Sequence, residues 1–217
     1  MSGIVSLSIR LTATMMIVAW LSCSSKQRQL PFYATPDFTP VWLRSDQSPA
    51  SMIGHRIGDF SFIDQNAKAV TQQTIKGKIH IANFMFTTCT SICPVMTNNM
   101  RSIQDAFAKE EKVMLLSYSV TPWSDSVPRL KKYAAKFGVQ DDKWYLLTGN
   151  TDEIYRLARQ GYFAEEETGF KKDSSEFLHT EHFMLVDGDG YLRGIYNGTL
   201  TLDVQRLVSD ISMLLKE

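Results

Sequence analysis

The sequence lacks three features that would each point to a class of protein. Its 23 Lys and Arg residues equal its 23 Asp and Glu residues, so no net charge draws the chain to nucleic acid. The apolar run at residues 11–21 is shorter than the ~20 residues that cross a bilayer comfortably. Three cysteines are too few for a disulfide framework. What remains, 217 residues that are 44% hydrophobic, is enough for one domain and a leader.

The first 22 residues predict an export signal. Arg10 precedes the apolar run, and Ser22 and Cys23 follow it. Cys23 resembles the lipidated cysteine of bacterial lipoproteins, which implies an exported protein held on a membrane and facing the periplasm or the cell exterior. Trp20 stands where the lipoprotein cleavage signal prefers an aliphatic residue, so an uncleaved membrane anchor is the alternative. Both readings tether the protein.

Residues 24–50 predict a flexible spacer, because they carry Pro31, Pro36, Pro40 and Pro49 among polar residues and no sustained period of 2 or 3.6. The folded domain is then expected over residues 51–217. It begins with a small β-hairpin around a turn at residues 64–66 and a short helix at 71–77.

Alternating strands and helices follow this hairpin. Residues 78–86 are almost continuously apolar, which is typical of a central strand buried on both faces. Further strands are expected at 113–120 and 144–147, followed late in the chain by a hairpin at 182–196. Helices are expected from Pro94 onward, before Gly138, at 151–160 and at the end of the chain. This order predicts an α/β, thioredoxin-like fold, with a central mixed sheet flanked by helices and an N-terminal β-hairpin.

Two cysteines fall at the edge where such sheets bind ligands. Cys89 comes just past the strand at 78–86, and Cys93 comes at the N-terminus of the next helix. Helix N–H groups and the macrodipole there are expected to lower the pKa of Cys93. Two soft thiolates suit Cu(I), and an added imidazole would also hold Cu(II). Zinc is an alternative for such a set, although copper ranks above it in affinity.

Four histidines could supply that imidazole. His55 precedes the first hairpin and His80 lies in the buried strand, so both are interpreted as structural. His179 and His182 remain. His179 falls in the loop that enters the late hairpin, opposite the cysteines, whereas His182 has already entered the strand.

The segments FMFTTCTSICP (84–94) and FLHTEHFMLVDGDG (177–190) resemble the two motifs of the SCO/SenC family. The resemblance runs from about residue 57 to the C-terminus and includes residues 125–149. It implies a tethered thioredoxin-fold copper chaperone that binds one copper ion through Cys89, Cys93 and His179. The family histidine stands eleven residues before the last Gly of the turn, which selects His179 over His182. Thr121 and the two residues at 123–124 depart from the usual pattern, although Asp125 agrees with it.

The resemblance also implies a partner and a redox gate. The partner is the cytochrome c oxidase subunit that carries the CuA centre. A disulfide between Cys89 and Cys93 would close the copper site. The alternative function is a membrane-tethered thiol-disulfide oxidoreductase that reduces cysteines of a partner protein. A peroxiredoxin is disfavoured, because Ala82 and Phe86 replace the Pro and Thr of its motif.

Overall fold

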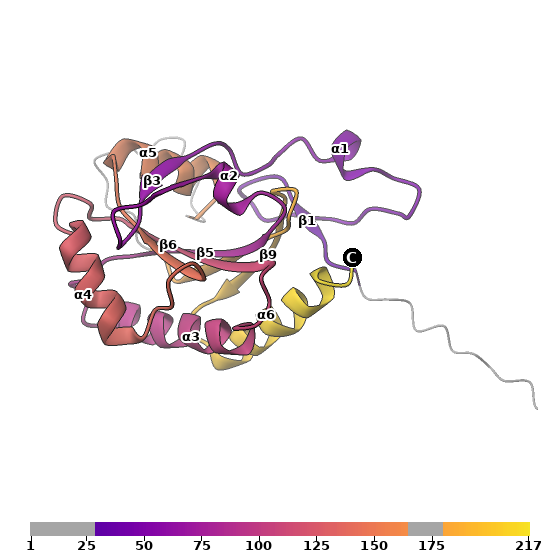
Figure 1. The fold of residues 1–217 in the computed structure, drawn as a ribbon. Coiled ribbons are helices and arrows are strands. Elements are labelled where there is room, and N and C mark those ends of the chain that lie inside the picture. The colour runs from indigo at the N-terminus through magenta and orange to yellow at the C-terminus, as the bar shows by residue number, and fades with distance from the viewer. Residues whose placement is uncertain (1–28, 165–179) are drawn as a thin grey trace, which may run out of the picture.

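A mixed sheet of seven strands forms the centre of the fold, in the order β2-β1-β9-β8-β5-β6-β7 (Figure 1). A computed structural model describes residues 29–164 and 180–217. The sheet consists of β1 (Phe32–Tyr33), β2 (Pro40–Val41), β5 (Ile79–Met85), β6 (Val113–Ser119), β7 (Trp144–Leu147), β8 (His182–Val186) and β9 (Leu192–Asn197). Strands β5, β6 and β7 run parallel, and β8 is antiparallel to β5. The predicted α/β fold with a central mixed sheet is confirmed.

The two central strands are buried on both faces, which explains their continuous apolar sequences. Every residue of β5 and of β6 is buried, and the two strands pair in parallel from Ile79 opposite Val113 to Met85 opposite Ser119. Alternate side chains therefore enter two separate cores, one on each face of the sheet.

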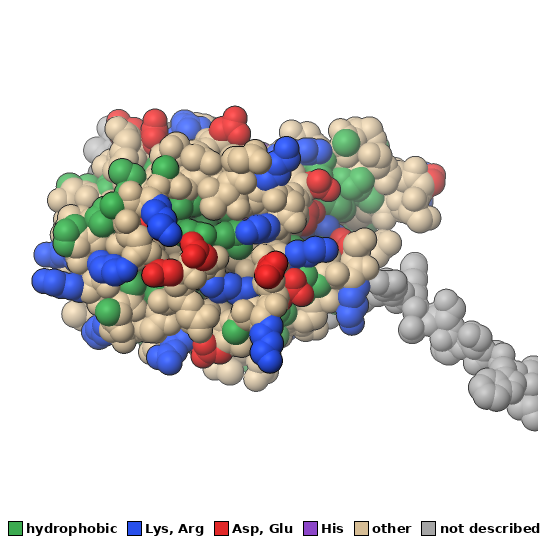
Figure 2. Space-filling view, in the orientation of Figure 1, with side chains coloured by type: hydrophobic (Ala, Val, Ile, Leu, Met, Phe, Trp, Pro, Cys, Tyr) green, Lys and Arg blue, Asp and Glu red, His purple; other side chains and the backbone are tan. Residues whose placement is uncertain are grey.

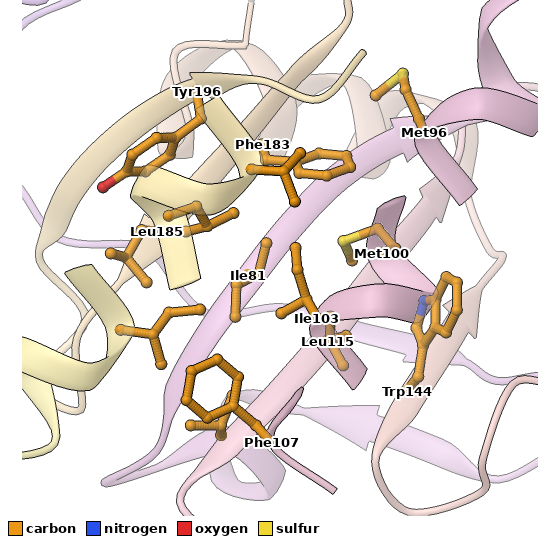
Figure 3. Close-up of a cluster of buried hydrophobic side chains, with 14 of the residues drawn as sticks. Ile81, Met96, Met100, Ile103, Phe107, Leu115, Trp144, Phe183, Leu185 and Tyr196 are labelled. Carbon is orange, nitrogen blue, oxygen red and sulfur yellow. The ribbon is translucent and has the colours of Figure 1, made fainter. Parts of the chain in front are cut away.

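Three helices cover one face: α3 (Ile92–Ala106), α4 (Val127–Phe137) and α6 (Thr201–Leu214). Gly138 adopts a left-handed conformation (φ 68°) and ends α4. In the core beneath these helices, Met96, Met100 and Ile103 of α3 form a stripe at helical spacing. Figure 3 shows Met100 and Ile103 of this stripe beside Ile81 of β5 and Leu115 of β6.

The opposite face carries the hairpin of β3 (Ser61–Ile63) and β4 (Ala69–Thr71), together with α2 (Gln72–Ile75) and α5 (Thr151–Arg156). The predicted N-terminal hairpin is thus present. The short helix α1 (Pro49–Met52) lies in a loop that projects beyond the sheet. The side chain of Asn150 caps α5 by accepting from the N–H of Glu153, and a π-helical turn, Leu157–Gly161, continues the helix.

The predicted spacer differs from the structure over its described part, residues 29–50. Tyr33 of β1 pairs with Leu192 at the edge of the sheet, and Leu30 is buried. The buried guanidinium of Arg193 donates to the carbonyls of Leu30 (3.0 Å) and Pro31 (3.1 Å). The segment is docked because a partner more than 160 residues away binds its backbone, which no local period reveals.

Strand direction gives the sheet two distinct ends. β5 ends at Met85 at the end where β8 begins, whereas β9 begins and α6 finishes at the other end. The candidate cysteines follow β5 and so lie at the first end. Within residues 29–164 and 180–217, no helix has the length and apolar character needed to span a bilayer.

Candidate metal and thiol site

Cys89 and Cys93 flank the start of α3, as expected from the sequence. Both are free thiols in this structure. The helix begins at Ile92, so Pro94 is its third residue and Cys93 its second. Because three residues separate the two cysteines, Cys89 lies before the helix and Cys93 lies in its first turn.

Cys89 occupies the place of a helix-capping acceptor. The side chain of Ser91, the N-cap residue, makes no capping hydrogen bond. Partial burial raises the pKa of Cys89, but N–H groups of Cys93, Ser91 and Ile92 and the thiol of Cys93 donate to its sulfur, and the net effect lowers the pKa. Cys89 is also the more exposed of the two thiols. It is therefore the sulfur best suited to react as a thiolate.

Cys93 has the opposite environment, which corrects the expectation that its pKa is lowered. Its side chain is 3% exposed and packs in the core beneath α3. Burial is the main cause that raises the pKa of Cys93 to about 12, and the hydrogen bond with Cys89 and the nearby charges of Cys89 and Asp125 act in the same direction, against one donor at Phe86. Position at a helix N-terminus favours an anion only when the sulfur faces the N–H groups, and here the sulfur before the helix does.

A buried carboxylate, which the sequence did not single out as functional, holds the Cys89 loop in place. Asp125 is 0% exposed and accepts from the N–H (3.1 Å) and the hydroxyl (2.5 Å) of Thr87. It also accepts from Ser119 (2.7 Å) and Thr121 (3.1 Å) at the end of β6. The only sequence signal was its agreement with the family pattern. The network ties the loop between β5 and Cys89 to the neighbouring strand.

The remaining predicted ligand, His179, and the predicted lipidation site, Cys23, lie outside the described residues. Within the described part of the chain, no cluster of three or more His, Cys, Asp or Glu side chains is arranged to hold a metal ion. Cys89 and Cys93 are the two candidate ligands that the structure brings together.

None of the three described histidines joins the two thiols in such a cluster. His55 bonds to the carbonyl of Gly161 (2.8 Å), and its ring stacks on Phe163. His80 is buried with its Nε2 atom 3.0 Å from the hydroxyl of Tyr162, and burial lowers its pKa to about 3. Both therefore have the structural contacts expected of them. His182 begins β8 and packs edge-on against Phe38.

Comparison with known sequences places both motifs within one family. The family model described as SCO1/SenC matches residues 49–216. The SCO1 protein homolog of Bacillus subtilis is 32% identical over 161 residues, which span 73% of this chain and 82% of that protein. The residues 49–216 matched by the family model include both cysteines and the second motif.

Solved structures resemble this chain over a similar extent. A SCO1/SenC family lipoprotein of Bacillus anthracis superposes with a TM-score of 0.65 at 28% identity, covering 75% of this chain and 96% of that one. BsSco, described as having a disulfide switch and as a member of the Sco family of cytochrome c oxidase assembly proteins, gives 0.61 at 31% identity (74% and 93%). Copper-bound ScoI of Bradyrhizobium japonicum gives 0.57 at 28% identity (71% and 96%).

Proposed function

This chain belongs to the SCO1/SenC family, and from that premise we propose that it carries one copper ion between Cys89, Cys93 and His179. It delivers this ion to the CuA centre of a cytochrome c oxidase. The observation that carries the proposal is the pair of free thiols at the carboxyl end of β5, one of them accessible at a helix N-terminus. Thiolates are the ligands that Cu(I) prefers, and copper-bound ScoI is among the similar structures.

The strand register supports His179 as the third ligand. β8 is antiparallel to β5 and pairs Ala82 with Met184, so the chain enters β8 at the end of the sheet where β5 finishes. His179 precedes the first residue of β8 by three positions in the sequence. An imidazole beside two thiolates would let the site hold Cu(II) as well as Cu(I).

Oxidation of the thiols closes the proposed site. The thiolate of Cys89 attacks a partner disulfide and displaces one partner thiolate, and Cys93 then loses its proton and attacks the mixed disulfide. Two electrons pass to the partner, which leaves as a dithiol, and a Cys89–Cys93 disulfide remains. The disulfide switch described for BsSco supports this step.

The inequality of the two thiols also favours a second candidate function. An accessible thiol of lowered pKa beside a buried thiol of raised pKa is an arrangement suited to thiol-disulfide exchange. The protein would then reduce cysteines of a partner, such as the metal-free oxidase subunit, rather than supply its copper.

The proposed location is outside the cytoplasm, on a membrane. The leader at residues 1–22 directs export, and Cys23 carries the lipid anchor or follows an uncleaved one. The similar protein of Bacillus anthracis is described as a lipoprotein, which supports the lipid anchor.

Metal retention tests the copper proposal. The chain from Ser24 onward is reduced, loaded with copper and freed of excess metal, and the bound copper is measured. About one ion per chain is expected, with loss in Cys89→Ser, Cys93→Ser and His179→Ala. His182→Ala is the matched control and should retain its copper. If Cys89→Ser, Cys93→Ser and His179→Ala all retain as much copper as the wild type, the proposal is contradicted.

Insulin reduction separates the two functions. If the protein is a copper carrier, His179→Ala should lower its copper retention, and the wild-type protein should reduce insulin only weakly. Strong insulin reduction that His179→Ala leaves intact would instead establish the oxidoreductase.

A further inference from the structure

The docked N-terminal segment leaves a short link to the proposed anchor. Leu30 is 5% exposed, and Arg193 donates to its carbonyl, so the chain is fixed to the domain from this residue on. Cys23 and Leu30 are seven residues apart. Even fully extended, seven residues span at most about 25 Å. A lipid on Cys23 therefore keeps the point where the chain joins the domain close to the bilayer.

This joining point lies at the end of the molecule opposite the thiols. Gln29 lines one cavity together with Glu217, so the described chain begins beside the C-terminus (Figure 1). Both lie at the end where β9 begins and α6 finishes. The seven residues of β5 run from near this end to the thiol end, a length of about 20 Å.

Large exposed apolar side chains gather around the joining point. The antiparallel pairing of Phe32 with Val41 places Trp42 alongside Pro31, and Trp42 lines a cavity of about 200 Å³ together with Gln29. The side chain of Trp42 is 60% exposed. Met52, in the loop with α1 that projects at the same end in Figure 1, is 51% exposed. Trp side chains favour the interface between a membrane and water.

Most basic side chains beside the joining point are paired with carboxylates. Arg44 pairs with Asp46 at 3.1 Å, Arg206 with Asp203 at 3.1 Å, and the buried Arg193 with Glu217 at 3.0 Å. On the face drawn in Figure 2, basic and acidic side chains are interspersed. Contact with a membrane would therefore depend on the apolar side chains and respond little to salt.

We infer that this end of the domain rests on the bilayer, with Trp42 in the headgroup region and the thiol end directed away from the membrane. The inference depends on the proposed tether and not on copper. A short link beside an exposed tryptophan restricts the orientations of the domain, whereas a long spacer would leave many open. A partner must then present its acceptor site at a height set by the length of the domain.

Quenching by brominated phospholipid tests the orientation in the mature chain that begins at the lipidated Cys23 and so lacks Trp20 of the leader. The metal-free protein is reconstituted into phosphatidylcholine vesicles with brominated acyl chains, and its tryptophan emission is compared with that in unbrominated vesicles. The amount of emission lost in brominated vesicles is expected to fall about two-fold or more in Trp42→Phe, because the bromines reach an interfacial indole. Trp123→Phe is the matched control, since Trp123 is 68% exposed at the thiol end and should contribute no quenching.

Three results would overturn the inference: equal quenching in wild type and Trp42→Phe, loss of quenching in Trp123→Phe, or failure of the chain to float with the vesicles. Quenching should also persist in 0.5 M salt. Its loss at this salt concentration would show that the contact is electrostatic and would contradict an apolar contact through Trp42. Because no copper is present, these results are independent of the metal-retention test.

Discussion

Replacing Asp125 tests the link between the buried carboxylate and the thiol loop. Asp125→Ala removes the acceptor for one backbone N–H and three hydroxyls, all of them buried or half-buried. The hydroxyls can rotate toward other acceptors, but the N–H of Thr87 cannot. Hydrogen bonds to a charged group contribute about 1.5–3 kcal/mol each, so losing the bond to this N–H and part of the others should lower the unfolding free energy by about 3–5 kcal/mol.

Asp125→Asn separates charge from shape. Its amide oxygen can replace Oδ2, which accepts from Thr87, Ser119 and Thr121, and its NH₂ group then faces a Thr87 hydroxyl that can accept. Only the charge assistance is lost, so the cost should fall to about 1–3 kcal/mol. Thr121→Val, which removes one of the four donors, should cost about 1 kcal/mol.

Urea unfolding of the reduced, metal-free chain from Ser24 onward measures these differences. The reasoning is refuted if Asp125→Ala costs less than about 1 kcal/mol, or if Asp125→Asn is as damaging as Asp125→Ala. A second measurement addresses the loop itself. If Thr87 holds Cys89 in front of the helix N–H groups, Asp125→Ala should slow alkylation of Cys89 at pH 7 more than Asp125→Asn does, because a displaced sulfur loses the donors that lower its pKa.

Three further predictions concern other buried polar groups. Iodoacetamide at pH 7.5 should label Cys89 well before Cys93, as peptide mapping would show, and equal labelling would contradict the assigned environments. The pKa of His80 is about 3 in the folded state against 6.5 ordinarily, so below pH 6.5 protons favour the unfolded chain. His80→Gln should remove a stability loss of about 2 kcal/mol between pH 6.5 and 5, measured by urea unfolding. Arg193→Met should cost about 3–5 kcal/mol and expose residues 29–50 to trypsin, whereas Arg206→Ala, at an exposed ion pair, should cost less than about 1 kcal/mol and leave proteolysis unchanged.

The sequence predicted the sheet and its flanking helices because their signals are local. The apolar runs of β5 and β6 follow directly from burial on both faces, and the residues from Trp144 to Leu147 match β7 as expected. The apolar residues of α3 repeat every three or four positions, so the sequence also predicted which face of this helix packs against the sheet.

The N-terminal segment could not be read in this way. Its order comes from β9 and from the buried Arg193, which also pairs with Asp187 and Glu217 and lies 4.1 Å from the ring centroid of Phe32. A proline-rich, polar stretch with no period looks flexible until its distant partner is known. Long-range polar contacts of this kind leave no signal in local sequence.

The error over thiol acidity has a geometric cause that bears on the proposed function. Cys93 lies on the same stripe of α3 as Met96 and Met100, so packing of the helix against the sheet forces its sulfur into the core. Cys89, four positions earlier, lies outside the helix, where its sulfur can accept from the N–H groups. Their inequality thus follows from the three-residue spacing and from the core, and surface substitutions would not remove it. In the proposed function, an incoming copper ion or partner disulfide therefore meets Cys89 before Cys93.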